Sequence, residues 1–261
     1  MDLGLNGRTA LVTGAGRGIG LAIARALAAE GVKVVGATRT ATPELAAVAT
    51  VATADLSTRQ GTEDAVGQAL ATLGGIDLLV NNVGAGDPSV FALGGVLDAA
   101  DEQWQSLFYL NVMSAVRTTR AALPSLLERR GAIVNVSSIN SRIPTGSPVG
   151  YAEAKAALTQ FGKRLSEELA SRGVRVNTVS PGPTSTDQWT AADGYGGRMA
   201  DAMGVPLDAL LDGLPARAGT ASGRLSTPEE VADLVVFALS DRAANIHGAD
   251  LVVDGGTLKS A

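Results

Sequence analysis

Two residues of the sequence, Tyr151 and Lys155, have the types and the spacing of a proton-donating pair. Residues at positions i and i+4 lie on the same face of a helix, so the stretch Tyr-Ala-Glu-Ala-Lys predicts an ammonium group next to a phenol. A tyrosine alone has a pKa of about 10, whereas a nearby positive charge favours the phenolate and lowers that pKa. The same spacing also occurs in helices where a solvated lysine lies beside a packed ring, so a second, independent pattern has to support the chemistry.

That second pattern lies near the N-terminus, where the apolar residues 9–12 lead into a glycine-rich turn and then into the helical pattern of residues 21–27. Glycines in such a turn let the backbone approach a pyrophosphate closely, and the free amides at the helix start face the anion. The spacing Thr-Gly-x3-Gly-Ile-Gly differs from the usual Gly-x-Gly-x2-Gly. The residues predicted to surround the pyrophosphate are Thr13, Gly14, Gly16, Arg17, Gly18, Ile19 and Gly20.

Both patterns need a scaffold, which the apolar pattern of the chain predicts. Seven runs rich in β-branched residues alternate with helical patterns, which predicts a parallel sheet with helices on both faces, a Rossmann-type doubly wound α/β fold. A length of 261 residues with 46% hydrophobic residues favours a single domain, residues 1–261. The predicted strands are residues 9–12, 32–37, 51–54, 76–80, 133–137, 175–180 and 250–253.

Local signals mark the ends of two helices. Thr227-Pro228-Glu229-Glu230 is a capping box with proline at the first helical position, and it predicts a helix that runs through Leu239. Pro124 predicts a kink or an end in the helix expected over residues 101–129.

Composition excludes several classes of function. The chain has no cysteine and one histidine, His247, which excludes disulfides and thiol nucleophiles and argues against metal sites and a histidine-dependent triad. A net charge of -5 without a basic, aromatic stripe disfavours binding to nucleic acids or anionic membranes. No apolar stretch approaches the roughly 18 residues of a membrane span, and no export signal begins the chain, so we expect a cytoplasmic protein.

Further motifs extend the two patterns into a resemblance to the classical short-chain dehydrogenase/reductase family over nearly the whole chain. Asn81-Asn82-Val83-Gly84 follows a predicted strand, although the family usually has alanine where Val83 stands. Residues 133–138 match the strand that ends on the family's catalytic serine, and residues 181–186 match the segment that holds the nicotinamide carboxamide. The resemblance implies an oxidoreductase similar to 3-oxoacyl-carrier-protein reductases and to carbonyl reductases, or ketoreductases.

The resemblance also implies a role for each catalytic residue. Tyr151 is the general acid in reduction and the base in oxidation, and Ser138 donates a hydrogen bond to the same substrate oxygen. Ser137 competes for this role, but the spacing to the tyrosine favours Ser138. Lys155 lowers the tyrosine pKa and binds the nicotinamide ribose. Asn111 holds a water that passes protons to Lys155, unless it is a polar residue that satisfies a helix break near Pro124.

The expected cofactor contacts beyond the glycine turn lie at strand ends. Asp55 and the Leu56 amide are expected at the adenine, and Asn82 and Gly84 at the adenine ribose, while turn chemistry alone also explains Asn82 and Asp55. The residues expected around the nicotinamide end are Tyr151, Lys155, Pro181, Gly182, Thr184 and Thr186.

Cofactor choice depends on the residues after the second predicted strand. NAD enzymes usually carry a carboxylate there for the ribose 2'-hydroxyl, but this chain reads Gly-Ala-Thr-Arg-Thr over residues 36–40. Arg39, with Arg17 as a second partner, can bind a 2'-phosphate through charge-assisted hydrogen bonds, which favours NADP(H). The alternative is that Arg39 is a solvated loop residue.

The leading hypothesis is therefore an NADP(H)-dependent carbonyl reductase or alcohol dehydrogenase, and the alternative is a catalytically silent dinucleotide-binding sensor. A sensor would be expected to lose catalytic residues, whereas all four are present. The substrate stays open between a 3-oxoacyl thioester and a polyketide-type ketone. Arg129, Arg130 and Arg172 resemble positions that meet an acyl carrier protein, but arginines at helix ends also complement the helix dipole. The resemblance further implies a homotetramer in which the strand near Val252 takes part.

One region, residues 184–225, lacks a strong pattern and is rich in Gly, Ala and Asp. We expect it to form short helices and to act as a substrate-binding lid, because it follows the segment assigned to the nicotinamide. Its glycines, residues 194, 196, 197 and 204, permit hinge motion, and Trp189, Tyr195, Met199 and Met203 offer apolar contacts. The alternative is a surface insertion that packs on the body of the protein.

Overall fold

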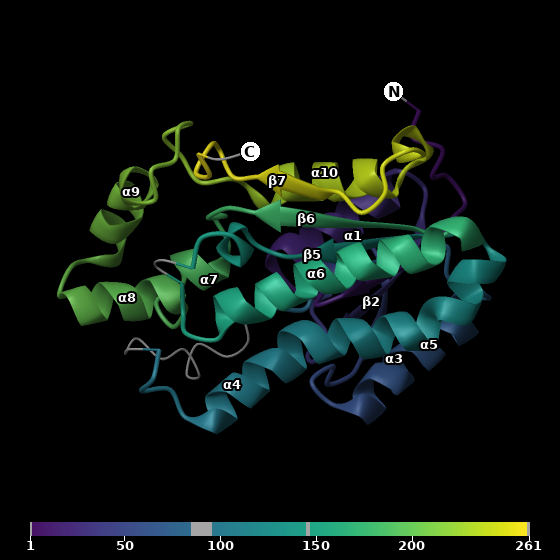
Figure 1. Cartoon of the computed structure of the whole chain (residues 1–261), viewed down its shortest axis with the longest axis horizontal. Coiled ribbons are helices and arrows are strands. Elements are labelled where there is room, and N and C mark those ends of the chain that lie inside the picture. The colour runs from purple at the N-terminus through teal and green to yellow at the C-terminus, as the bar shows by residue number, and fades with distance from the viewer. Residues whose placement is uncertain (1, 85–95, 145–146, 260–261) are drawn as a thin grey trace.

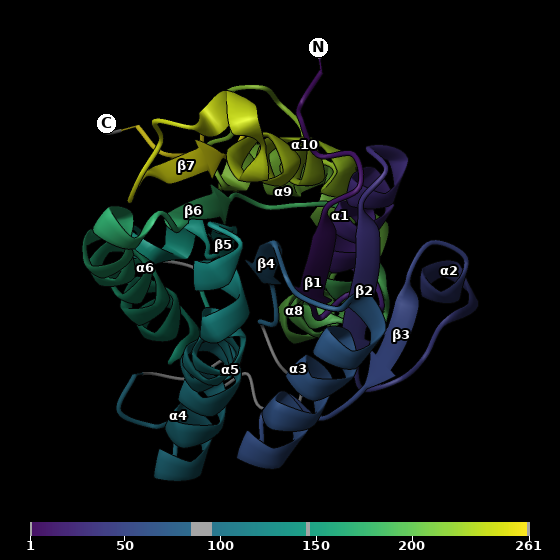
Figure 2. The same ribbon diagram turned by 90° about the vertical axis from the view of Figure 1, so that its right-hand side faces the viewer.

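A computed structural model describes residues 2–84, 96–144 and 147–259 of the chain. Its centre is a parallel sheet with the strand order β3-β2-β1-β4-β5-β6-β7, which confirms the predicted fold. In Figure 2, α5 and α6 lie on one side of the strands and α10 lies on the other side. The strands are β1 (Thr9–Thr13), β2 (Lys33–Thr38), β3 (Thr50–Thr53), β4 (Leu78–Asn81), β5 (Ala132–Val136), β6 (Arg175–Pro181) and β7 (Asp250–Val253).

Helices cover both faces of the sheet, as the buried parallel strands require. One apolar core joins the sheet to α1 and α10, and the other joins it to α3, α5 and α6. Figure 1 shows α8 and α9 beyond the end of the sheet toward which the β6 arrow points. The helices are α1 (Gly18–Ala29), α2 (Pro43–Ala46), α3 (Arg59–Leu73), α4 (Asp101–Phe108), α5 (Ser114–Glu128), α6 (Tyr151–Leu169), α7 (Asp187–Thr190), α8 (Tyr195–Met203), α9 (Leu207–Arg217) and α10 (Pro228–Leu239).

The order of the strands determines where a ligand can bind. The chain runs outward from β1 to β3 on one side and from β4 to β7 on the other, so the connections leave β1 and β4 in opposite directions. In doubly wound sheets such a reversal opens a crevice at the carboxyl ends of the two strands. The glycine-rich turn follows β1, and Asn82 to Gly84 follow β4, so both motifs lie at this crevice.

The helix expected over residues 101–129 is interrupted, but not at Pro124. A π-helix, Tyr109–Met113, separates α4 from α5, and α5 continues through Pro124 to Glu128. Of the two predicted effects of Pro124, an end of the helix is therefore wrong, while a kink stays a prediction. Pro124 and Arg120, four residues before it, are both exposed, so the hydrogen bond that proline cannot donate is missing on the solvent-facing side of α5. Single π-turns inside α-helices are frequent at functional sites.

The capping box at the start of α10 is confirmed in detail. The Thr227 hydroxyl accepts a hydrogen bond from the Glu230 amide at 3.2 Å, and the Glu230 carboxylate accepts one from the Thr227 amide at 2.8 Å. The pKa of Glu230 falls to about 2, first because of its hydrogen bond with Arg224 and then because of the Thr227 amide. In the described part of the chain, none of the helices combines the length and hydropathy that a membrane span requires.

Candidate active site

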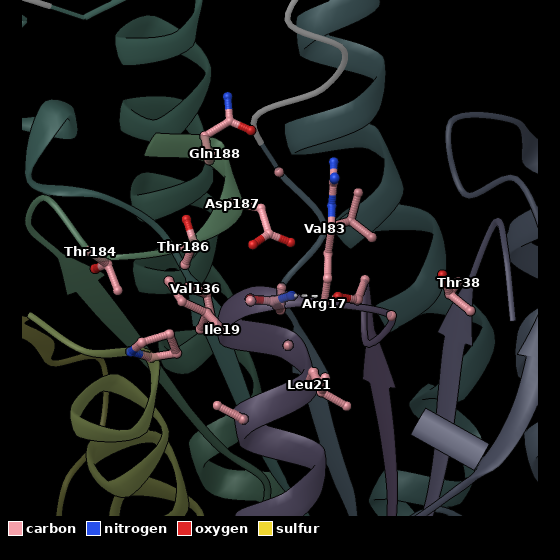
Figure 3. A pocket seen from close by; sticks show the side chains of 18 of the residues that line it. Arg17, Ile19, Leu21, Thr38, Val83, Val136, Thr184, Thr186, Asp187 and Gln188 are labelled. Carbon is pink, nitrogen blue, oxygen red and sulfur yellow. Dashed lines mark hydrogen bonds between the residues drawn. The ribbon is translucent and has the colours of Figure 1, made fainter. Parts of the chain in front are cut away.

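A cavity of about 1040 Å³ lies at the carboxyl ends of the strands and extends from the glycine turn to Tyr151. Its size is at the upper end of the range for small-molecule and cofactor sites. Figure 3 shows Thr186 and Asp187 on one wall and Arg17 and Ile19 of the glycine turn on the other. The predicted site residues that line this cavity are Gly14, Gly16, Arg17, Gly18, Ile19, Gly20, Arg39, Asp55, Leu56, Asn82, Gly84, Ser138, Tyr151, Lys155, Pro181, Gly182, Thr184 and Thr186.

The glycine turn has the backbone that a pyrophosphate site needs. Gly14 and Gly18 adopt φ angles of 65° and 54°, in the left-handed region that favours glycine. A Cβ atom on Gly18 would lie 3.3 Å from the Thr186 methyl carbon, so a side chain there would reduce the space between the turn and the opposite wall. The first turn of α1 begins at Gly18 and directs its amides toward this space. The turn therefore fits a dinucleotide phosphate.

Thr13 does not line the cavity, in contrast to the sequence prediction. Its side chain is buried, donates to the Val80 carbonyl at 3.1 Å and accepts from the Asn82 amide at 2.9 Å. Asn82 in turn donates through Nδ2 to the Thr13 carbonyl at 3.1 Å and to the Gly14 carbonyl at 3.2 Å. Thr13 and Asn82 thus tie the ends of β1 and β4 together and fix the glycine turn, while only Asn82 also faces the cavity.

The two arginines predicted for a 2'-phosphate line the same cavity, and both are exposed. Thr42, which sequence reasoning missed, holds their two loops together. Its hydroxyl donates to the Gly16 carbonyl at 3.2 Å and accepts from the Leu45 amide at 3.3 Å as the N-cap of α2. Thr42 precedes Pro43, a signal for a helix start that was available in the sequence. The tertiary contact with Gly16 had no such signal.

Asp55 at the far end of the cavity makes the turn that the alternative interpretation predicted. One of its carboxylate oxygens accepts from the Ser57 hydroxyl at 2.7 Å and from the Ser57 amide at 3.0 Å. These hydrogen bonds lower the pKa of Asp55, with a further contribution from the charge of Arg39. Asp55 and the buried Leu56 still line the cavity, so turn formation and a place beside the adenine are compatible.

Of the two competing serines, only Ser138 is directed toward Tyr151. The Ser137 hydroxyl donates to the Lys155 carbonyl at 3.0 Å and lies 2.7 Å from the Thr159 hydroxyl, so it is used within the packing of α6. Ser138 is hydrogen-bonded to Tyr151, and this contact lowers the tyrosine pKa. Its hydroxyl also accepts from the Asn140 amide at 3.1 Å, which fixes its orientation.

Lys155 and Tyr151 lie on the same face of α6, as their spacing predicts. The Lys155 ammonium nitrogen is 5.7 Å from the centroid of the Tyr151 ring and donates to the Val136 carbonyl at 2.9 Å. Lys155 is 2% exposed, and this burial lowers its pKa to about 7. Burial also raises the pKa of Tyr151, which outweighs the effect of Ser138. The expectation of a lowered tyrosine pKa is therefore wrong for the protein without cofactor, because desolvation dominates.

Asn111 lies in the π-helix, close to the lysine but outside the cavity lining. Its amide donates to the Leu107 carbonyl at 2.9 Å, so it does satisfy a helix irregularity, although not one caused by Pro124. A Cβ atom on Gly84 would lie 2.6 Å from the Lys155 nitrogen and 3.0 Å from the Asn111 Oδ1 atom. The absence of a side chain at Gly84 thus leaves room for both polar groups beside the cavity.

The arginines considered for carrier binding lie at the amino ends of the strands, away from the cavity, just before β5 and β6 begin. The Arg129 guanidinium is 3.5 Å from the Asp77 carboxylate and donates to the Gly74 carbonyl at 3.0 Å. The Arg130 side chain packs on Gly173, whose added Cβ would lie 3.3 Å from Arg130 Cγ. Arg129 therefore has a structural role whether or not a carrier binds. The described residues contain no group of three or more His, Cys, Asp or Glu side chains that could hold a metal ion.

Comparison with known proteins agrees with this fold. A family model described as enoyl-(acyl carrier protein) reductase matches residues 14–257. With a 3-oxoacyl-[acyl-carrier-protein] reductase FabG of Escherichia coli strain K12, the chain shares 34% identity over 264 residues, which cover 97% of this chain and 98% of the relative. The chain belongs to the short-chain dehydrogenase/reductase family, and it is an oxidoreductase of the carbonyl and alcohol type.

Two further similar proteins differ in their substrates. A D-beta-hydroxybutyrate dehydrogenase of Cupriavidus necator is 34% identical over 271 residues, 97% of this chain and 98% of the relative. The crystal structure of L-sorbose reductase from Gluconobacter frateurii, complexed with NADPH and L-sorbose, has a TM-score of 0.90 and 32% identity, with both chains covered completely. The relatives thus agree on the reaction type and disagree on the carbonyl compound.

Proposed function

We propose that this protein is an NADP(H)-dependent ketoreductase in which Tyr151 is the general acid and base. The observation that carries the proposal is one cavity lined both by the glycine turn and by Ser138, Tyr151 and Lys155. The residues fit a nicotinamide dinucleotide, which supplies or accepts the hydride when bound. The solved L-sorbose reductase contains NADPH, which favours this cofactor.

In the proposed mechanism the chain handles the proton and the developing charge. The Tyr151 hydroxyl gives its proton to the carbonyl oxygen of the substrate, and the Ser138 hydroxyl donates a hydrogen bond to the same oxygen. Lys155 stabilises the resulting phenolate with its charge and binds the nicotinamide ribose. Asn111 holds a water from which the proton is replaced through Lys155. In alcohol oxidation the same residues act in reverse.

The function is tested by the consumption of NADPH with a panel of carbonyl compounds. The panel contains a ketohexose, an acetoacetyl thioester, a polyketide-type ketone and a quinone, with NADH as the cofactor control. We expect reduction of at least one class and a preference for NADPH. The alternative, a catalytically silent sensor, predicts that NADPH binds but that no compound is reduced.

Arg39→Asp tests the assignment of the cofactor. An aspartate repels the 2'-phosphate where Arg39 would bind it, and a charge-assisted hydrogen bond contributes about 1.5–3 kcal/mol, which is roughly ten- to hundredfold in affinity. We expect NADPH affinity, measured by the quenching of protein fluorescence, to fall by that factor while NADH affinity is kept or improved. The control is Arg172→Asp, which makes the same charge change at an exposed arginine before the amino end of β6, away from the cavity. An unmutated protein that prefers NADH would contradict the assignment.

The substrate class is proposed with two alternatives. A 3-oxoacyl thioester is favoured by the FabG relatives, and it brings with it an acyl carrier protein as a possible partner. A polyketide-type or other small ketone is favoured because Arg129, Arg130 and Arg172 lie at the amino ends of the strands, away from the cavity. A homotetramer is proposed by resemblance alone. The edge strand β7 is partly exposed along its whole length in the single chain, which leaves it open to contact with another copy.

Residues 184–225 are proposed as the lid of this site. They contain α7, α8 and α9, and Trp189 packs edge-to-face on Tyr195 with ring centroids 5.2 Å apart. The glycines of this region, however, have another explanation than hinge motion. Cβ atoms on Gly194, Gly196 and Gly197 would overlap backbone atoms of residues 187–192, so these glycines allow α7 and α8 to pack closely. Gly204, which ends α8 with a φ of 65°, has open space around it.

Trp189→Ala and Met203→Ala together test the lid. Trp189 lines the cavity, whereas Met203 is 42% exposed and lies outside the lining, so the two substitutions are a matched pair. We expect Trp189→Ala to change the KM or the order of preferred carbonyl compounds, with little change in Tm, and Met203→Ala to leave the kinetics unchanged. Unchanged kinetics in both variants would favour a surface insertion instead of a lid.

A further inference from the structure

The segment that follows β7 is held in a turn by hydrogen bonds between its own residues. Asp254 is 8% exposed, and its two carboxylate oxygens accept from the Gly256 amide at 2.8 Å and from the Leu258 amide at 2.7 Å. The Asp254 carbonyl accepts from the Thr257 hydroxyl at 2.8 Å. A buried carboxylate with two amide donors holds a fixed backbone turn. We call residues 254–259 the clasp segment.

The clasp segment contacts the nicotinamide side of the cavity. The Gly182 amide donates to the Val253 carbonyl at 2.9 Å, next to Asp254. A Cβ atom on Gly182 would lie 2.6 Å from Asp254 Cβ and 2.8 Å from Asp254 Cα, so only glycine allows this approach. Pro181 and Gly182 line the cavity beside Thr184. The position of the cavity wall at Gly182 therefore depends on Asp254.

The same segment also holds the chain where it returns from the lid. The Ser222 amide donates to the Gly255 carbonyl at 2.9 Å, and the Lys259 ammonium donates to the Gly219 carbonyl at 2.7 Å. The hydroxyls of Thr220 and Thr257 are buried and lie 3.1 Å apart. Because the Thr257 proton is used for the Asp254 carbonyl, Thr220 is the donor in this pair. Figure 1 shows the yellow end of the chain beside the green segment after α9.

Among the described residues, hydrogen bonds at Ser226 join the entry and the exit of the lid independently of the clasp segment. The Ser226 amide donates to the Pro183 carbonyl at 3.0 Å, and the Ser185 amide donates to the Ser226 carbonyl at 2.9 Å. Between Arg217, at the end of α9, and Ser226, the hydrogen bonds that reach outside the lid run from residues 219–222 to residues 255–259 and from the Arg224 guanidinium to the Glu230 carboxylate of α10. Residues 218–223, which we call the exit segment, therefore make their hydrogen bonds outside the lid to the clasp segment, while Arg224 is held separately by Glu230.

We propose that Asp254 is a positioning residue whose turn clamps the nicotinamide wall at Gly182 to the exit of the lid at residues 219–223. The clasp segment sets the position of the lid relative to the reacting carbonyl without touching the substrate. The catalytic consequence rests on the proposed function, whereas the mechanical link between the clasp segment and the lid does not.

Asp254→Asn tests the clamp, because the amide keeps the volume but turns an NH2 group toward one of the two backbone donors. Asp77→Asn is the matched control: its Oδ2 atom also accepts two hydrogen bonds, from the Thr9 amide at 2.9 Å and the Thr9 hydroxyl at 2.7 Å, at the amino ends of the strands, away from the cavity. Thr257→Val is a milder second variant, which removes the hydroxyl between Asp254 and Thr220. Each variant is assayed at a temperature that lies the same number of degrees below its own Tm.

The first measurement is limited proteolysis with trypsin. Trypsin cleaves after the exposed Arg217 and Arg224, which flank residues 218–223. We expect cleavage there to be about tenfold faster in Asp254→Asn and also faster in Thr257→Val, but unchanged in Asp77→Asn. The second measurement is the KM for the carbonyl substrate with saturating NADPH, which rises about tenfold in Asp254→Asn with a smaller change in kcat. Equal cleavage in Asp254→Asn and Asp77→Asn would overturn the clamp. Faster cleavage in a protein that reduces no carbonyl compound would instead refute the proposed function and leave the clamp intact.

Discussion

Tyr151→Phe is expected to lower turnover by about 10²- to 10⁴-fold while the affinity for NADPH is retained. The substitution removes the hydroxyl that donates the proton, yet it keeps the ring that packs above Lys155 at 5.7 Å. The loss should appear in kcat, since the proton moves in the chemical step and the ring makes the ground-state contacts. Steady-state kinetics together with a fluorescence titration of NADPH separate the two effects.

Tyr109→Phe is the control for this substitution, because it removes a phenolic hydroxyl from a tyrosine that is 46% exposed and does not line the cavity. It should leave turnover within about twofold of the unmutated value, as expected for surface changes. A Tyr151→Phe protein with unaltered turnover would remove Tyr151 from the mechanism, and Ser138 and Lys155 would then lack the group on which they are proposed to act.

Lys155→Met is expected to reduce both turnover and cofactor affinity, each by at least about tenfold, because the ammonium is assigned to the phenolate and to the ribose. The same variant changes the pH dependence of stability. In the unfolded chain the lysine keeps its proton up to about 10.5, whereas burial lowers the pKa of the folded group to about 7. Folding between these two pH values therefore releases a proton, and raising the pH favours the folded state.

The free energy of unfolding of the unmutated, cofactor-free protein should thus rise with pH relative to Lys155→Met. The slope is at most about 1.4 kcal/mol per pH unit above pH 7, and the difference between the two proteins is constant below that pH. Urea denaturation at several pH values measures it. Lys163→Met, at an exposed lysine two turns further along α6, keeps Lys155 and serves as the control, so its unfolding free energy should follow the pH profile of the unmutated protein. Parallel pH profiles for all three proteins would mean that Lys155 keeps its proton in the folded state.

Local patterns in the sequence determined the fold and predicted the main residues of the candidate site. Strand and helix periodicities predicted the sheet, because a parallel sheet covered on both faces needs apolar runs alternating with helical segments. The spacing of Tyr151 and Lys155 predicted a shared helix face, and the capping box at Thr227 predicted the start of α10. Each of these features depends on residues within about one helical turn or one strand, so a linear reading of the chain contains them.

Long-range contacts decided the rest. The π-helix at Asn111, rather than Pro124, interrupts the long helix, and its neighbours Gly84 and Lys155 come from other elements. The pKa values of Tyr151 and Lys155 follow from burial, which the sequence pattern did not contain, so desolvation reversed the expected shift of the tyrosine. The contact between Gly182 and Asp254 joins residues far apart in the chain, and only the folded sheet brings β6 and β7 close enough to make it. The sequence thus determined which groups the site contains, while their packing in the tertiary structure determined their charge and their support.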